Sequence, residues 1–202
     1  MRLLIDTDAF CKLGVADLLD AALAAIGVDL SDCARLAALP HMLRRGKLVR
    51  LYGAERCSAL LRRAEEIDVI PEASPEWLEP LAESRDIDPG EAQLFAVAAQ
   101  KKLSVLTNDK RALRAVARVE AVRAALDGRI VSLEAMLSRL CDAMDLAQLR
   151  TALASLEHDQ LVRICFSSGS PDPREALRSY LDSLQEEVSP LMLWGPAEGR
   201  IT

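Results

Sequence analysis

The sequence predicts an α/β fold in three layers, with a mainly parallel central sheet, followed by a helical extension at the C-terminus. Short apolar runs alternate with longer segments in which apolar residues recur at helical spacing, the order expected of strands joined by crossover helices. Half of the 202 residues are apolar, enough for a core that buries roughly 70% of the surface of the unfolded chain. Runs typical of strands end near residue 131, while helical patterns continue. We therefore expect an α/β domain over residues 1–141 and a helical extension over residues 142–202.

The first predicted strand is the apolar run at residues 2–5, which lacks polar alternation and therefore indicates a strand buried on both faces. A helix follows it, and Gly27 is the kind of residue at which helices commonly stop. Ser31 can cap a second helix, which Pro40 ends or interrupts. The arginine-rich stretch 54–66 predicts a further helix.

Strands and helices keep alternating up to residue 141. The remaining predicted strands are 67–70, 103–107 and 129–131, and the remaining predicted helices are 75–84, 88–102, 109–118 and 132–141. Proline in the first turn indicates the start of two of these helices, and Asp109 and Ser132 can cap two others. Because parallel strands share one direction, their carboxyl ends meet at one edge of the sheet, where α/β proteins bind their ligands.

Several classes of protein are excluded by composition. The longest stretch without a charged residue is the ten-residue run 188–197, whereas a membrane-spanning helix needs roughly 20 apolar residues. Asp6 comes too early for the apolar middle of a secretory signal. The five cysteines are widely spaced and form no CxxC pair, so we expect buried thiols rather than a zinc site or disulfides. The sequence thus predicts a cytoplasmic protein that does not enter a membrane.

The net charge of −6 conceals two basic blocks that are separated by an acidic one. Residues 35–63 hold eight basic residues against one acid, and residues 100–130 hold eight against three. Two readings stay open: the blocks meet in space as one surface that binds phosphates, or they are ordinary solvated helix faces. The candidate nucleic-acid-binding residues are Arg44, Arg45, Lys47, Arg50, Lys110 and Arg111.

Acidic residues follow two of the predicted strands, and another lies at the start of a predicted helix. Asp6 follows the first strand, Asp109 follows the strand 103–107, and Glu91 lies in the first turn of the helix 88–102. Taken singly, Asp8 and Asp109 can be helix caps, and Glu91 can form a reciprocal capping pair with Asp88. Taken together at one sheet edge, carboxylates repel one another unless a cation is bound. Mg²⁺ or Mn²⁺ prefers such oxygen ligands and can activate a water for phosphodiester cleavage.

At these positions the sequence resembles the PIN-like nucleases. The matching motifs are Leu3-Leu4-Ile5-Asp6-Thr7, then Gly90-Glu91-Ala92 followed by Leu94, Ala96 and Ala98, and finally Leu106-Thr107-Asn108-Asp109-Lys110. The resemblance covers roughly residues 1–140. It implies a fold like that of bacterial toxin ribonucleases, Mg²⁺- or Mn²⁺-dependent cleavage of RNA as a toxin or RNA-processing factor, and partners such as an antitoxin, a regulatory protein or a second copy of the chain.

The same resemblance implies roles for individual residues. Asp6, Glu91 and Asp109 would be the catalytic metal ligands. Thr107 and Asn108 would shape the loop and orient Asp109, and Asp8 would be auxiliary.

The chain departs from the family at the acid that the second helix usually supplies. The stretch 35–39 offers alanines there, and Asp32 lies one or two turns too early. Three acids can hold one ion together with several waters, whereas a second ion would be held weakly. The extension after residue 141 could replace, cover or regulate the site.

Two other functions stay open. A catalytically silent PIN-like module would bind RNA or a protein partner through the basic blocks. A phosphatase similar to the haloacid dehalogenases would use Asp6 and Asp8, but Phe10 stands where that motif needs Thr or Val. Neither histidine lies in a setting that indicates a nucleophilic triad.

Overall fold

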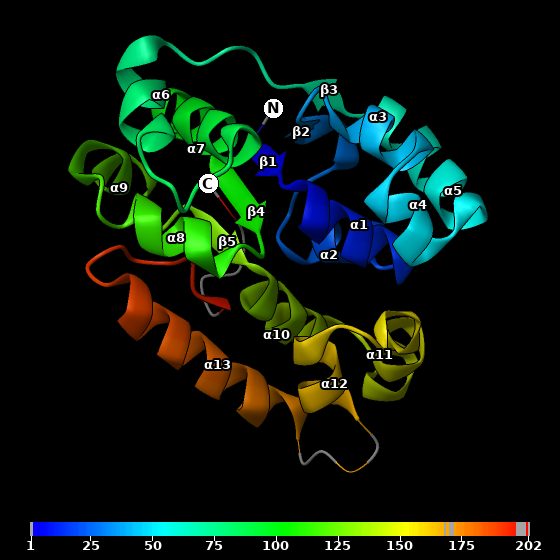
Figure 1. Ribbon diagram of the computed structural model, residues 1–202. Helices are drawn as coiled ribbons and strands as arrows, with labels where there is room; N and C mark the ends of the chain where they lie inside the picture. Colours follow the sequence, from blue (N-terminus) through cyan, green and yellow to red (C-terminus); the bar gives the residue numbers. More distant parts are fainter. Residues whose placement is uncertain (1, 168, 170–171, 197–200, 202) are drawn as a thin grey trace.

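A five-stranded sheet lies at the centre of the molecule (Figure 1). The computed structural model describes residues 2–167, 169, 172–196 and 201. The strands are β1 (Leu3–Ile5), β2 (Cys33–Arg35), β3 (Asp68–Val69), β4 (Ser104–Thr107) and β5 (Ile130–Ser132), in the spatial order β3-β2-β1-β4-β5. Every pair of neighbouring strands is parallel. The predicted α/β class and parallel sheet are therefore confirmed.

The central position of β1 decides where the site can form. Leu3 pairs with Cys33 of β2 on one side and with Ser104 of β4 on the other. In this register Ile5 and Leu106 lie side by side, so the residues that follow β1 and β4 emerge next to each other. These residues are about 100 positions apart in the sequence, and the pairing of β1 with β4 is enough to bring them together.

Helices cover both faces of the sheet (Figure 1). Up to the last strand these helices are α1 (Thr7–Val15), α2 (Leu19–Ala25), α3 (Leu39–Arg44), α4 (Lys47–Tyr52), α5 (Ala54–Glu65), α6 (Pro75–Ala82), α7 (Pro89–Lys101), α8 (Lys110–Val116) and α9 (Glu120–Leu126). Successive strand residues point to opposite faces. Leu3 and Ile5 accordingly join a core with α1, α2 and α10 (Leu133–Ala143), whereas Leu4 joins a second core with α6 to α9. The layers are helix, sheet and helix.

The prediction of a helix beginning at Ser31 is wrong. A short 3₁₀ turn, Leu30–Asp32, leads directly into β2, and the next helix, α3, begins at Leu39. Pro40 lies in the first turn of α3, so it starts this helix rather than ending an earlier one. The three residues of β2 become a strand because β1 and β3 pair with them, which no local pattern reveals.

The single helix predicted before Gly27 is also divided. Asp17 adopts a left-handed backbone conformation with φ of 55°, which α-helices exclude, and this separates α1 from α2. The predicted stop at Gly27, where φ is 74°, is confirmed. The helices and strands predicted between residues 54 and 141 are present, each within a few residues of its expected bounds, and α9 and the short α4 are additional.

The C-terminal segment packs on the α/β part. Its helices are α11 (Leu146–Leu153), α12 (Gln160–Phe166) and α13 (Pro173–Val188), with a 3₁₀ turn at Ala154–Leu156. Leu149 and Leu177 belong to the same apolar cluster as Leu3 of the central strand. After α13 the chain returns to the sheet, where the Trp194 N–H donates to the Ile130 carbonyl oxygen at 2.9 Å. The extension thus shares a core with the residues before it.

Two further expectations concern the whole chain. All five cysteines are buried and free, as predicted. Within the described residues, no helix has both the length and the apolar composition needed to span a membrane.

Candidate functional site

A cavity of about 920 Å³ opens at the carboxyl edge of the sheet. It is lined by seven acidic residues, namely Asp6, Asp8, Asp88, Glu91, Asp109, Glu134 and Asp159, and by the basic residues His41, Arg45, Lys47 and Lys110. Met42, Leu48, Leu51 and Leu161 add an apolar part. The four acidic residues that the sequence indicated all line this cavity, although they come from three separate parts of the chain; they are Asp6, Asp8, Glu91 and Asp109.

Asp6 lies at the end of β1 and is almost completely buried, with 7% of its surface exposed. Its side chain makes no capping bond to α1, and its Oδ2 accepts a long hydrogen bond of 3.4 Å from the Thr107 hydroxyl. Burial, with the charges of Asp8, Asp109 and Asp88 nearby, raises the pKa of Asp6 from 3.8 to about 7, although a backbone hydrogen bond from Thr7 opposes the rise. This carboxyl group is therefore poised to change its charge near neutral pH.

Glu91 is held at the start of α7 by the predicted capping pair. Its Oε2 accepts from the Asp88 N–H, and Asp88 Oδ1 accepts from the Glu91 N–H, both at 2.8 Å. Gly90 permits this placement, since a Cβ there would lie 3.1 Å from the Leu36 side chain. Burial, together with a hydrogen bond with Asp109, raises the pKa of Glu91 from 4.5 to about 8. Glu91 thus keeps its proton in that pair.

Asp109 is fixed by the loop that follows β4. Its N–H donates to the Thr107 hydroxyl at 3.1 Å, and its Oδ1 accepts from the Ala112 N–H at 2.8 Å, so it caps α8 as predicted. Burial raises the pKa of Asp109, but the hydrogen bonds from Glu91 and from the helix backbone outweigh it, so the pKa falls below 3.8. Asp109 is the ionised partner of Glu91.

Asp8 lies in the first turn of α1 rather than at its cap, which Asp6 occupies. Asp8 Oδ2 accepts from the Asn108 amide at 2.9 Å and pairs with Lys12 Nζ at 2.7 Å. Asn108 therefore binds Asp8, while the hydroxyl of Thr107 orients Asp109. Lys12 also pairs with Asp159 at 2.7 Å, and these two acids outweigh burial and raise the pKa of Lys12.

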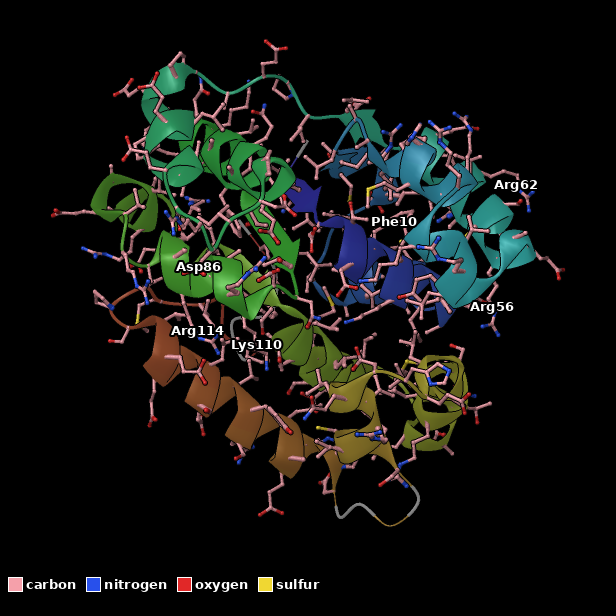
Figure 2. The ribbon with its side chains drawn as sticks, in the orientation of Figure 1. Phe10, Arg56, Arg62, Asp86, Lys110 and Arg114 are labelled. Atoms are coloured by element: carbon pink, nitrogen blue, oxygen red, sulfur yellow. The ribbon has the colours of Figure 1, made fainter. Side chains whose placement is uncertain are left out.

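The predicted cations divide into two groups. Arg45, Lys47 and Lys110 line the cavity. Arg44, Arg50 and Arg111 are exposed but do not line it, and Arg44 pairs with Glu65 of α5 at 3.2 Å. The two basic blocks thus meet at the cavity through a few residues only. Arg56 and Arg62, by contrast, extend outward from α5 (Figure 2).

The acidic residues provide the oxygen donors that Mg²⁺ or Mn²⁺ prefers. In the described part of the chain, however, no three His, Cys, Asp or Glu side chains are already arranged as a metal site. Glu91 and Asp109 are hydrogen-bonded to each other, and each also accepts a backbone N–H. The donor chemistry therefore fits a divalent ion, and binding would require Glu91 to release its proton.

Residues that the sequence analysis missed complete the cavity wall. Glu134 follows β5 by two residues and lies in the first turn of α10. The rule that drew attention to Asp6 and Asp109, an acid just after a strand, would have found it. Asp159 caps α12 and Tyr180 lies in α13, and no local pattern connects them with the sheet edge.

Residues 35–39, where the resemblance to the PIN-like nucleases implies a further acid, form the end of a strand and the segment that follows it. Arg35 ends β2 there, and its Nε donates to the Ala64 carbonyl oxygen at 2.6 Å. This side chain is buried and holds β2 against α5. The carboxyl end of β2 therefore contributes no acid to the cavity.

Comparisons of the chain with protein-family models, with curated proteins and with solved structures found no match.

Proposed function

We propose that the protein is a PIN-like, metal-dependent ribonuclease that hydrolyses phosphodiester bonds at the carboxyl edge of its sheet. The proposal depends on the convergence of Asp6, Glu91 and Asp109, which come from three elements and line one cavity. Burial raises the pKa of Asp6 and of Glu91, so a bound cation would relieve a real electrostatic cost. The parallel sheet supports the same assignment, because it brings the three motifs of the resemblance to one place.

The cations around the acidic floor of the cavity, which is formed by Asp6, Glu91 and Asp109, support RNA as the substrate. A polyanion approaches carboxylates only where positive charge offsets the repulsion. Arg45 and Lys47 supply that charge from the α3–α4 segment, and Lys110 supplies it from α8. Figure 1 shows α4 and α8 on opposite sides of the start of α1, so a strand crossing the cavity would meet cations on both sides.

The residues that would hold the ion are Asp6, Glu91 and Asp109. A bound Mg²⁺ or Mn²⁺ would supply a Lewis acid and an activated water for hydrolysis. The chain's own contribution is to fix the carboxylates in place. Thr107 links Asp6 to the backbone of Asp109, and the capping pair with Asp88 holds Glu91 at the helix start.

The second candidate is a catalytically silent PIN-like module that binds RNA or a protein partner. The hydrogen bond between Glu91 and Asp109 favours it, because two carboxyl groups that share a proton are stable together without a cation. The same cavity and the same cations would then serve for binding only. The toxin or RNA-processing role, the antitoxin or regulatory partner, the homodimer and the cytoplasmic location remain expectations from the sequence.

A cleavage assay separates the two candidates. Labelled single-stranded and structured RNA is incubated with the protein in MgCl₂, MnCl₂ or EDTA. We expect cleavage with metal only, and its loss in Asp6→Asn and Asp109→Asn. Glu72→Gln is the matched control, because Glu72 is exposed and does not line the cavity. Folded wild-type protein that cuts no RNA with either metal would overturn the nuclease, and RNA binding by that protein would support the silent module.

A further inference from the structure

Lys110 is held in an unusual way on one wall of the cavity. It is the first residue of α8, directly after the capping residue Asp109. Its ammonium group lies 2.6 Å from Glu134 Oε1 and 5.2 Å from the centre of the Tyr180 ring. Figure 2 shows Lys110 between α8 and α13. One lysine thus receives contacts from α10 and from the C-terminal extension, and all three side chains line the cavity.

Folding stability does not account for this arrangement. Glu134 is only 1% exposed, and neither of its carboxylate oxygens has a well-aligned hydrogen-bond partner among the described residues, so Oε1 meets Lys110 as an ion pair. A buried carboxylate with an unpaired oxygen carries a desolvation cost, and apolar replacements of such ion pairs are often neutral or stabilising. What the pair does achieve is to place an ammonium group at a defined point beside the acidic floor. The Lys110 side chain remains 34% exposed, so a ligand in the cavity can still reach it.

We propose that Glu134 and Tyr180 are positioning residues that hold the Lys110 ammonium group as a phosphate-binding group of the RNA site. An ammonium group has three N–H donors. The ion pair with Glu134 and the cation–π contact with Tyr180 restrain the long side chain, which leaves N–H donors for a phosphate oxygen. Helix α13 is then part of the substrate site rather than a separate appendage. The inference rests on the proposed function as far as the RNA substrate is concerned.

Binding measured without cleavage tests the inference. The probe is a fluorescein-labelled single-stranded RNA of ten nucleotides, titrated in EDTA over a series of KCl concentrations. Lys110→Met should weaken binding about 5- to 10-fold at low salt and reduce the slope of log K against log salt by about 0.7, the value for one phosphate contact on a single strand. The matched control is Arg111→Met, which removes the same charge one residue away and outside the cavity.

Three more variants separate positioning from simple charge. Glu134→Gln makes the protein more positive, so general electrostatics predicts tighter binding, whereas positioning predicts weaker binding. Tyr180→Phe keeps the ring and should bind as wild type, while Tyr180→Leu should weaken binding. The double variant Lys110→Met/Glu134→Leu should melt at or above the wild-type temperature and yet bind RNA as weakly as Lys110→Met, which would separate the lost affinity from any loss of stability.

Each outcome decides between the ideas. Equal effects of Lys110→Met and Arg111→Met, or unchanged or tighter binding by both Glu134→Gln and Tyr180→Leu, would overturn the inference while leaving the nuclease intact. RNA binding that depends on Lys110 in a protein that cuts nothing would overturn the nuclease and support the inference. Wild-type protein that binds no RNA would overturn both.

Discussion

The most direct test of the acidic site is the pH dependence of stability in Asp6→Asn. In the folded protein the pKa of Asp6 is raised from 3.8 to about 7, chiefly by burial. Between these two pH values the folded state holds a proton that the unfolded chain has released. The free energy of unfolding therefore falls as the pH rises through this window, by about 1.4 kcal/mol per pH unit at most. Asparagine cannot titrate, so the variant lacks this fall.

The expected size follows from the two pKa values. Between pH 5 and pH 8, wild-type protein should lose about 2–3 kcal/mol of stability relative to Asp6→Asn. Glu91, whose pKa is about 8, titrates in both proteins, so its contribution largely cancels in the difference. The assay is urea denaturation followed by circular dichroism at pH 5, 6, 7 and 8 in EDTA, with Glu72→Gln as the control that should follow wild type.

Metal addition extends the same experiment. At pH 8, Mg²⁺ at ten times its dissociation constant should stabilise wild-type protein by about 1.4 kcal/mol. It should have little effect on Asp6→Asn, which lacks one of the proposed ligands. A stability difference that stays within a few tenths of a kcal/mol from pH 5 to pH 8 would refute the view that Asp6 is held neutral by burial. Equal stabilisation of both proteins by Mg²⁺ would refute Asp6 as a ligand.

Three other predictions follow from single contacts. Asp109→Asn should abolish cleavage but leave the urea midpoint nearly unchanged, because asparagine also caps helices. Asp109→Ala, which removes the cap, should lower the free energy of unfolding by about 1 kcal/mol. An equal loss of stability in both variants would contradict the capping role. Asp159→Asn keeps the cap of α12 but removes the ion pair with Lys12, and should lower the free energy of unfolding by about 1–2 kcal/mol, measured by urea denaturation. Arg45→Glu should weaken RNA binding in filter assays more than Arg44→Glu, because Arg45 lines the cavity and Arg44 does not, so equal effects would show that the cavity is not where RNA binds.

Most of the elements could be predicted because their signals are local. Capping residues and proline mark the starts of α7, α8 and α10, and apolar runs mark β1, β4 and β5. The failure at residues 31–40 has a physical cause. The β2 segment Cys-Ala-Arg has no β-branched residue, and it becomes a strand only because β1 and β3 supply its hydrogen bonds.

In the candidate site, too, some residues could be predicted from local sequence signals and others could not. Asp6, Glu91 and Asp109 could be chosen from the sequence because each follows a strand or starts a helix, and parallel strands end at one edge. The roles of Asn108 and Lys12 could not be chosen in this way. Both depend on side-chain contacts with Asp8, and the Lys12 contact is completed by Asp159 from the extension.

The sequence by itself determined the α/β class and the placement of Asp6, Glu91 and Asp109 at one edge of the sheet, since strand alternation and helix caps are properties of neighbouring residues. Only the tertiary structure decided which charges act on one another. Packing brings Glu134 and Tyr180 to Lys110, separates Arg44 from the cavity, and buries Asp6 until its pKa lies near neutrality. Electrostatic energies depend on the distance between charges and on the exclusion of water from between them. For residues far apart in the chain, only the folded structure sets these two quantities.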